Sequence, residues 1–525
     1  MVRYLDNGKN SGFAAWAANK DQNNKGGQSL LSRILLWTGI ALLAWWLAGT
    51  LVSPKKLEIK PMAMPTAEAI AADVPAQLIE NDNIAATIRG LRISNIELKN
   101  FKDGAHNVTL LDGDKEFMEI GFGTQNTEVP NATTIWKNPR LTGPQVNLMW
   151  ANNAGVEFLC RFEQVDGYNG QYGCKVTNKS RNPISISSYA RIVRNGDEKT
   201  SATVATGGIA FANGSVHRES WDDLEKRSEN FTGAGFVGFT DQYWQTIAQL
   251  NTTVLPDADN NLRLRKRTDG MFQADSGTDF VTIAPGESQE FSYFVFTGPK
   301  EAKLLSIAAP HIHGIDQTID YGWFWFLSKP FLWALNSLHN IFGNYGIAII
   351  ILTLFLRILM WPLTRKSYSS MAAMQKMQPE MQRIQKLYGD DKIRLQQEMM
   401  NLYKTHKTSP MSGCLPMLLQ IPIFFALYKT LLISVQMRSA NFLWIADLSV
   451  MDPYFILPVL MAATMWWQQK LSTSANTPAM PGMGFMKWMP FIFGAMFAWM
   501  PAGLVLYWTV SNLFGIGQIY VIKKK

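Results

Sequence analysis

Arg357 carries the side chain whose position most needs a chemical explanation, because it interrupts the apolar run IAIIILTLFLRILMWPLTRK at 347–366. An arginine near the middle of a membrane span costs about 2.5–3.5 kcal/mol on insertion scales. Two interpretations stay open from this run alone. The guanidinium either reaches along the last turns of its helix to the membrane surface, or it lies in a wet hollow where it would attract acidic and polar groups.

Other polar residues interrupt predicted spans in a similar way. Thr353 lies one helical turn before Arg357, and Gln420, Ser511 and Asn512 lie in two further apolar runs. Polar groups surrounded by lipid normally pair with each other or line a water-filled cavity. Their presence on several spans favours a shared polar hollow, which is the candidate site.

Residues for hydrolysis or metal binding are not recognisable in the sequence. It lacks a G-x-x-x-x-G-K-[ST] phosphate loop, an H-E-x-x-H pair and a G-x-S-x-G nucleophile motif. The three cysteines form no C-x-x-C pair, and His311 and His313 have no third ligand nearby in the sequence. We therefore expect a protein that is not an enzyme and that uses no cofactor or metal.

Six apolar runs are predicted to cross a membrane, and the eighteen tryptophans fit that class of protein. These spans are 34–52, 345–363, 414–435, 454–469, 486–501 and 502–522. Basic residues concentrate in 1–33, in 364–413 and at the very end of the chain, whereas the loop 436–453 is poor in them. The positive-inside rule then places both termini in the cytoplasm. The fourth and fifth spans are short, which favours local thinning of the bilayer.

The region 53–320 is predicted to be a linker followed by an antiparallel β-sandwich on the outer side of the membrane. Its short runs alternate apolar and polar residues between Asn, Gly, Asp and Pro turns. Cys160 and Cys174 flank the turn-like DGYNG, so they form either a cross-strand disulfide or two buried thiols. The aromatic segment 321–344 is predicted to be an amphipathic helix in the outer interface, or else a buried helix of the sandwich.

The cytoplasmic segment 364–413 has the pattern of two helices that fold back around YGDDK, at Gly389, Asp390 and Asp391. Pro379 should kink or restart the first arm. The apolar stripes of the two arms are expected to pack together; they consist of Met374, Met377, Met381, Ile384 and Tyr388, and of Ile393, Gln396, Met400 and Tyr403. The alternative is that the methionines form an adaptable binding surface.

Several motifs in the C-terminal third resemble those of the YidC/Oxa/Alb family of membrane protein insertases, in their Gram-negative YidC form. They are RILMWPLTRKSYSSMAAM, MQPEMQRIQKLYGDDKIRLQQEMMNLYK, GCLPMLLQIPIFFALYKTL, DPYFILPVLM and PAGLVLYWTVSNLF, together with DYGWFWF before the second span. The resemblance implies a multi-pass α-helical protein with a five-helix core, a cytoplasmic hairpin and a large periplasmic β-sandwich.

The resemblance also implies a function in the bacterial inner membrane. A groove with one arginine, matching Arg357, would take up nascent membrane proteins, insert them and help them fold, alone or with the Sec translocon, without nucleotide hydrolysis. Tyr507 and Trp508 match the family's contacts with the inserting helix. The hairpin would receive substrate and meet the ribosome and Sec components. The protein would also contact membrane lipid, and we expect no specific DNA partner. Trp508 stands where a tyrosine is common, and we expect the unusual Lys429 to reach outward to the membrane surface.

Two other classes of function remain as alternatives. A solute transporter would need a pathway to both sides of the membrane and usually an internal repeat, and the unequal spans show neither. A glycan receptor would depend on the sandwich, whereas an insertase would largely retain its function without it.

Overall fold

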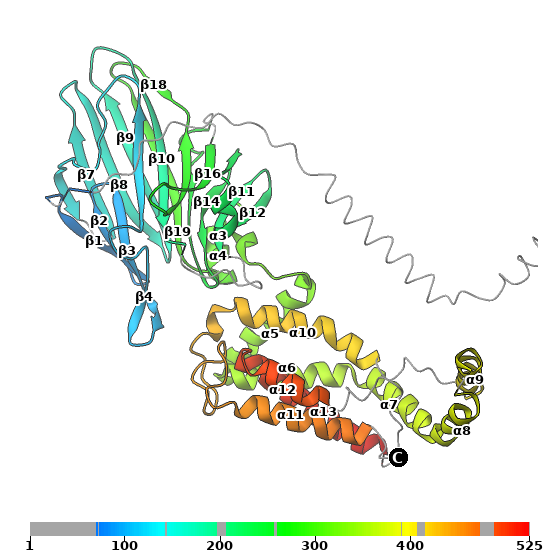
Figure 1. Ribbon diagram of the computed structural model, residues 1–525. Helices are drawn as coiled ribbons and strands as arrows, with labels where there is room; N and C mark the ends of the chain where they lie inside the picture. The colour runs from blue at the N-terminus through cyan, green and yellow to red at the C-terminus, as the bar shows by residue number, and fades with distance from the viewer. Residues whose placement is uncertain are drawn as a thin grey trace, which may run out of the picture. The chain divides into compact units, whose positions relative to one another are not determined.

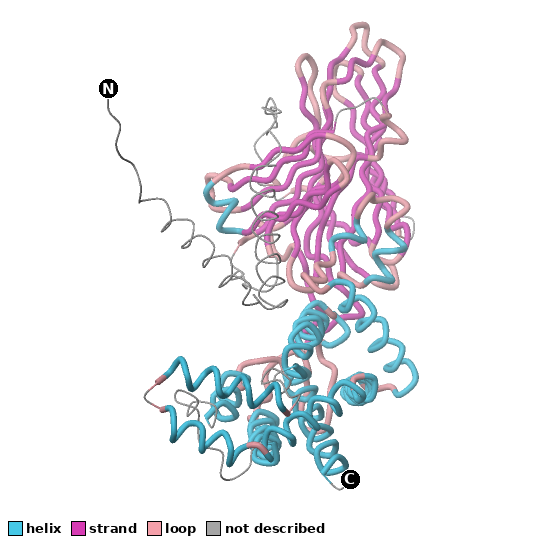
Figure 2. The backbone as a smooth tube through the Cα atoms, turned by 90° about the vertical axis from the view of Figure 1, so that its right-hand side faces the viewer, coloured by secondary structure: helices cyan, strands magenta, loops and turns pink. Residues whose placement is uncertain are grey.

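The computed structural model describes residues 70–71, 73–141, 144–196, 206–256, 260–389, 391–406, 415–472 and 488–523. All of them belong to one compact unit, Pro61–Lys525. The strands come first along the chain and the long helices follow (Figure 1). Strands and long helices form separate groups (Figure 2). The predicted first span, 34–52, lies outside the described residues.

The first half of the unit is a sandwich of two antiparallel sheets (Figure 1). Sheet A has the order β1-β2-β3-β5-β10-β17-β16-β13, with β4 beside β3 and β18 beside β10. Its strands are β1 Ala76–Glu80, β2 Ile84–Arg89, β3 Arg92–Asp103, β4 His106–Leu110, β5 Phe117–Thr124, β10 Ile184–Arg194, β13 Glu229–Thr232, β16 Asn260–Lys266, β17 Phe272–Thr278 and β18 Val281–Ile283.

Sheet B has the order β12-β11-β14-β15-β19-β9-β8-β7-β6. Its strands are β6 Lys137–Leu141, β7 Gln145–Ala151, β8 Val156–Asp166, β9 Asn169–Asn178, β11 Gly207–Ala212, β12 Ser215–Ser220, β14 Phe236–Thr240, β15 Trp244–Leu250 and β19 Ser288–Pro299. Three short helices accompany the strands, α3 Trp221–Lys226, α4 Ala302–Ala308 and the 3₁₀ helix η1 Ile315–Thr318.

The apolar face of each sheet turns toward the other sheet, as the period-two pattern predicts. Along β8, Val156, Phe158 and Phe162 are buried, and more exposed residues alternate with them. Phe122 of sheet A meets Phe158 and Phe291 of sheet B edge to face, with ring centroids 5.1 and 6.0 Å apart. Such aromatic contacts contribute about 0.5–1.5 kcal/mol each beyond area burial, so they help to fix how the sheets pack.

Cys160 and Cys174 are joined by a disulfide between neighbouring strands. They are directly opposite each other in the register of β8 and β9, and both are buried. Of the two states that the sequence leaves open, the structure therefore has the disulfide. Closing a loop of this length stabilises a fold by about 3 kcal/mol in the chain-entropy model.

The second half of the unit is helical. Its helices are α5 Trp325–Phe342, α6 Tyr345–Leu359, α7 Trp361–Lys376, α8 Gln378–Tyr388, α9 Lys392–Thr405, α10 Leu415–Ile433, the 3₁₀ helix η3 Val435–Met437, α11 Ile456–Ser472, α12 Met489–Phe497 and α13 Ala502–Lys523. The amphipathic α5 buries Phe331 and Leu335 and leaves Trp333 and Ile341 exposed. This pattern fits a helix that lies in a membrane interface.

Among the described helices, one is long and apolar enough by itself to cross a membrane, Ala502–Ile522. Tyr345–Leu359 and Trp361–Ser367 pass the same test together but are bent by 59°. The apolar stretch Leu419–Ile433 is shorter. Helix α12 has nine residues, about 14 Å at 1.5 Å per residue, so it is shorter still than the short span that the sequence predicts there. Six spans thus stay a prediction.

The segment 364–413 forms two antiparallel arms, but the packing differs in part from the prediction. Met377 and Tyr403 are buried, whereas Ile393 is 74% exposed and Met400 is 49% exposed. In α9 the less exposed apolar positions are Leu395, Met399 and Leu402, spaced by four and three residues. The stripe predicted for this arm is therefore partly wrong: α9 is rotated so that a different set of apolar residues is less exposed. The sequence of α9 carries two apolar stripes, and the prediction chose the other one. The side chain of Met374 is not among those that the structure describes.

Candidate functional site

A cluster of polar side chains joins three helices of the helical half. Arg357 of α6 donates from Nε to the Ser511 hydroxyl of α13, over 2.6 Å, and its Nη2 donates to the same oxygen. Gln420 of α10 donates from Nε2 to the Tyr507 hydroxyl of α13. We call these four residues the polar cluster; α6, α10 and α13 run close together in Figure 1.

Local helix geometry explains how the polar cluster forms. Tyr507 and Ser511 are four residues apart, so both lie on one face of α13. Arg357 lies in the last turn of α6, where a cation interacts favourably with the helix dipole. Tyr507 and Ser511 are 2% and 1% exposed, whereas Arg357 is half-buried. The guanidinium is thus directed toward α13 instead of along its own helix.

Three other predicted site residues have different partners. The Thr353 hydroxyl bonds to the Ile349 carbonyl one turn back, over 2.6 Å, so it satisfies itself within α6. Asn512 is directed toward α11, where its amide lies 3.3 Å from the Thr464 hydroxyl. Trp508 packs against phenylalanine rings of α10 and α12, with the Phe497 centroid 5.1 Å away. The sequence predicts one hollow for all these residues, whereas neighbouring positions on α13 face different helices.

The polar face of α13 continues past the polar cluster. Gly515 leaves room for the Gln468 amide of α11, because a Cβ atom there would lie 2.5 Å from its nitrogen. Gln518 is 2% exposed and approaches the Thr364 hydroxyl of α7 at 3.5 Å. The interpretation of the sequence missed Gln518 and Thr364. Gln518 follows Ser511 by seven residues, and Thr364 follows Arg357 by seven. This spacing could have identified both, since residues seven apart share a helix face.

Lys429 of α10 has a charged partner in the structure. Its ammonium group forms an ion pair with Asp320, at 2.6 Å from Oδ2, and the lysine side chain is 13% exposed. Asp320 precedes α5 in the chain, so the pair connects the end of the sandwich region to the last turn but one of α10. The outward direction of Lys429 toward the membrane surface stays a prediction, and its charged partner lies far away in the sequence.

The hairpin residues of the candidate site define helix ends. Asp391 is the N-cap of α9 and accepts hydrogen bonds from the backbone N–H groups of Ile393 and Arg394. Pro379 lies at the start of α8, where its missing N–H does no harm, so the first arm restarts there. Gly389 follows α8 directly. Asp390 lies outside the described residues.

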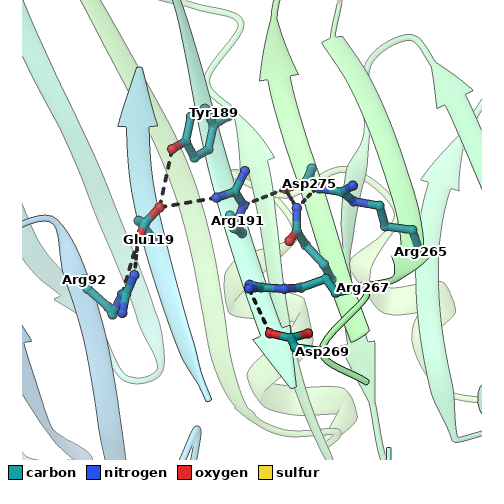
Figure 3. Close-up of polar contacts among 9 residues, drawn as sticks. Arg92, Glu119, Tyr189, Arg191, Arg265, Arg267, Asp269 and Asp275 are labelled. Atoms are coloured by element: carbon teal, nitrogen blue, oxygen red, sulfur yellow. Dashed lines mark hydrogen bonds and ion pairs between the residues drawn. The ribbon is translucent and has the colours of Figure 1, made fainter. Parts of the chain in front are cut away.

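A second cluster of charged residues lies in sheet A (Figure 3). Glu119 forms ion pairs with Arg92 at 2.6 Å and with Arg191 at 3.6 Å. Asp275 pairs with the other side of Arg191 at 3.1 Å. The side chains of Arg191 and Asp275 are 0% and 1% exposed. These charges pair with one another, and Arg191 and Asp275 are buried, so we interpret the cluster as a structural network.

Of the described residues, no group of three or more His, Cys, Asp and Glu could hold a metal ion. His311 and His313 make different contacts. The His311 ring packs against the Phe294 ring, with the ring centroids 5.0 Å apart, and the backbone N–H of His313 donates to the side-chain oxygen of Gln249.

Comparison with known proteins relates both halves of the chain to described families. The family described as "60Kd inner membrane protein" matches residues 337–525, and the family described as "YidC periplasmic domain" matches residues 77–334. The curated relatives include the membrane protein insertase YidC of Rickettsia bellii, 34% identical over 90% of this chain and 91% of that protein. YidC of Sinorhizobium fredii is 33% identical over 89% of this chain and 84% of that protein.

Solved structures give weaker likenesses. The crystal structure of an active YidC insertase is 18% identical, covers 85% of this chain and 94% of its own, and has a TM-score of 0.36. A galactose mutarotase related enzyme from Lactobacillus acidophilus is 11% identical, covers 42% of this chain and 97% of its own, and has a TM-score of 0.30. Both TM-scores are below 0.5, a level at which a likeness does not establish a shared fold.

Proposed function

This chain belongs to the YidC family of membrane protein insertases, and from that premise we propose how it inserts its substrates. The polar cluster around Arg357 receives the polar or acidic segment of a nascent membrane protein. The apolar part of the substrate then leaves toward lipid along α10 and α12. The protein also acts as a chaperone for the inserted helices, and it works without nucleotide hydrolysis.

The observation that carries this proposal is the direction of the Arg357 side chain. A charge that only served to anchor a helix end would extend to the membrane surface. Arg357 is instead held against Ser511 by two hydrogen bonds and remains half-exposed. A positively charged guanidinium on a partly exposed residue can attract a carboxylate, which reduces the cost of moving an acidic segment into the membrane.

The topology and the partners are part of the same proposal. We place both termini and the hairpin 364–413 in the cytoplasm, and the sandwich in the periplasm, with six spans. The basic residues of the hairpin support contact with the ribosome, because ribosomal RNA is strongly negative. The insertion step largely proceeds without the sandwich, and the protein works alone or with the Sec translocon.

Substitution of Arg357 tests the proposal. In cells depleted of the native protein, Arg357→Ala should lower insertion of a single-span substrate with an acidic N-terminal segment by about tenfold or more. This follows because a hydrogen bond to a charged group contributes about 1.5–3 kcal/mol, and 1.4 kcal/mol is a factor of ten. Arg357→Lys should retain much of the insertion.

The matched control is Arg161→Ala, which removes an arginine whose side chain is 55% exposed on the sandwich. The control should insert substrate normally. Unchanged insertion in both Arg357 variants, with normal amounts of protein in the membrane, would overturn the electrostatic role.

A further inference from the structure

An apolar groove runs along one face of α11. It has a volume of about 570 Å³, and the residues of α11 that line it include Leu460, Ala463, Trp467 and Lys470. Volumes of about 300–1,000 Å³ are typical of sites that bind small molecules. Leu460 and Trp467 are 44% and 46% exposed, so the groove is open to a molecule from outside the described part of the chain.

The groove is apolar along most of its length. Its lining residues Leu460, Ala463, Thr464 and Trp467 recur at intervals of three and four, so they share one face of the helix. Thr464 is the polar member of this series, and its hydroxyl bonds to the Leu460 carbonyl one turn back, at 2.8 Å. The hydroxyl proton is therefore used within α11, and an occupant of this part of the groove should be a hydrocarbon.

The length of the groove matches one leaflet of a bilayer. Leu460 and Lys470 are ten residues apart, about 15 Å along a helix that rises 1.5 Å per residue. The hydrocarbon core of a bilayer is about 30 Å thick, so each leaflet contributes about 15 Å. Lysine and tryptophan are both favoured where hydrocarbon meets water, and the Lys470 ammonium group lies 5.1 Å from the centre of the Trp466 ring. An acyl chain in the groove would thus bring its headgroup to Lys470.

The charge at this end of the groove calls for an anion. Among the described residues, Lys470 contacts the Trp466 ring and is paired with no carboxylate. The sequence from Pro453 to Lys525 contains five lysines and no aspartate or glutamate. Basic groups beside a membrane attract anionic lipid headgroups. A lipid phosphate can therefore supply the counter-charge that this part of the chain lacks.

We propose that the groove binds one anionic phospholipid, with an acyl chain along Leu460, Ala463 and Trp467 and the headgroup phosphate at Lys470. With the topology proposed above, the lipid belongs to the cytoplasmic leaflet. The polar cluster lies on α6, α10 and α13, so the lipid site on α11 is separate from it and does not depend on the role of Arg357.

The lysine gives the site a preference for one class of headgroup. A net negative headgroup, such as that of phosphatidylglycerol, interacts more favourably with the ammonium group than a zwitterionic one does. One lysine near the membrane surface should make this preference about fivefold in affinity. An apolar protein helix in the same groove would show no such preference, so a nascent helix or a second copy of the chain can be distinguished from a lipid.

The test uses the full chain in detergent micelles, with thermal unfolding followed as lipid is added. Phosphatidylglycerol and phosphatidylcholine with identical acyl chains are compared at equal ionic strength. A ligand that binds the folded state raises Tm with its concentration, and phosphatidylglycerol should reach the same rise at an about fivefold lower concentration. Glycerol 3-phosphate carries the phosphate without an acyl chain and should cause no rise, which separates a lipid site from a site for free phosphate.

Two variants locate the effect. Lys470→Gln removes the charge, and Ala463→Trp fills the groove at an exposed position while it keeps the charge. Both should lose the preference for phosphatidylglycerol. The matched control is Lys329→Gln, because Lys329 of α5 is also an exposed lysine near a tryptophan ring, 5.8 Å from that of Trp325, and does not line the groove. The control should keep the preference.

The proposal is overturned if the unmodified protein responds equally to the two lipids, or if the preference persists in Lys470→Gln. A response to glycerol 3-phosphate equal to that to the lipid would also overturn it, because the acyl chain would then be unnecessary. If Lys470→Gln does not fold, Ala463→Trp decides: a preference that survives in this variant places the lipid elsewhere and refutes the inference.

Discussion

At the scale of single residues, the structure chooses between two roles for one charged side chain. Arg357 had two comparable explanations in the sequence, and the bonds to Ser511 favour a guanidinium that is fixed at the polar cluster. Lys429, which we expect to reach outward to the membrane surface, is paired with Asp320. In both cases the partner is more than a hundred residues away in the sequence.

The hydroxyl of Ser511 should matter for insertion because it holds the guanidinium in place. We expect Ser511→Ala to lower insertion of the acidic single-span substrate by about three- to tenfold, or about 0.65–1.4 kcal/mol. This is less than the effect of Arg357→Ala, because the charge remains and only its positioning is lost. Ser511→Thr keeps the oxygen and should insert substrate more efficiently than Ser511→Ala. The measurement is the fraction of substrate inserted in depleted cells.

A suitable control for this variant is Ser306→Ala, since the Ser306 hydroxyl is exposed on α4 and bonds only to the Lys303 carbonyl among the described residues. Equal insertion by Ser511→Ala and Ser306→Ala would show that the hydroxyl does not position Arg357 for function.

At the scale of elements, the loop before α11 shows how a short segment fixes the start of a helix. Asp452 is fully buried, and its carboxylate accepts hydrogen bonds from the indole of Trp444 at 3.1 Å and the backbone N–H of Leu457 at 2.7 Å. It also accepts from the N–H of Tyr454. One carboxylate thus holds the loop against the first turn of α11.

Removal of this carboxylate should destabilise the helical half. We expect Asp452→Ala to reduce the free energy of unfolding by about 2 kcal/mol, because it removes a cap and leaves buried donors unsatisfied. The measurement is thermal unfolding of the purified protein in micelles. Asp447→Ala is the control in the same loop, where the carboxylate caps a local turn at Ser449 and is only half-buried; a Tm as low as that of Asp452→Ala would contradict the assignment.

At the scale of the whole molecule, the polar cluster is built from helices alone. Arg357, Gln420, Tyr507 and Ser511 come from α6, α10 and α13, and the strands contribute none of them. The sandwich contacts the helical half through other residues, such as Gln242, which donates to the Leu432 carbonyl at 3.0 Å. The polar cluster and the sandwich are therefore separable in structure.

Deletion of 60–298 should leave insertion of single-span substrates close to that of the full chain, while thermal stability decreases because the contacts to α10 are lost. The same deletion combined with Arg357→Ala should lose insertion, which serves as the control. If the deletion abolishes function while the shortened protein is present in the membrane at normal amounts, the sandwich has an essential role, as a glycan receptor would require.

The sequence by itself determined the two halves of this protein, its family and most of its elements. Alternating residues marked the strands, and long apolar runs marked α6, α10, α11 and α13, because both patterns depend on local periodicity. Its motifs were specific enough to identify the YidC family, which the comparisons confirm.

Only the tertiary structure decided which side chains meet. The hydroxyl at 511 faces Arg357 while the amide at 512 faces Thr464, because successive positions on a helix are rotated by about 100°. The rotation of α9 and the partner of Lys429 were equally undetermined, since each depends on the packing of segments that are distant along the chain. The same packing brings Arg218, Lys300 and Lys429 around one small cavity, an arrangement that no local pattern in the sequence indicates.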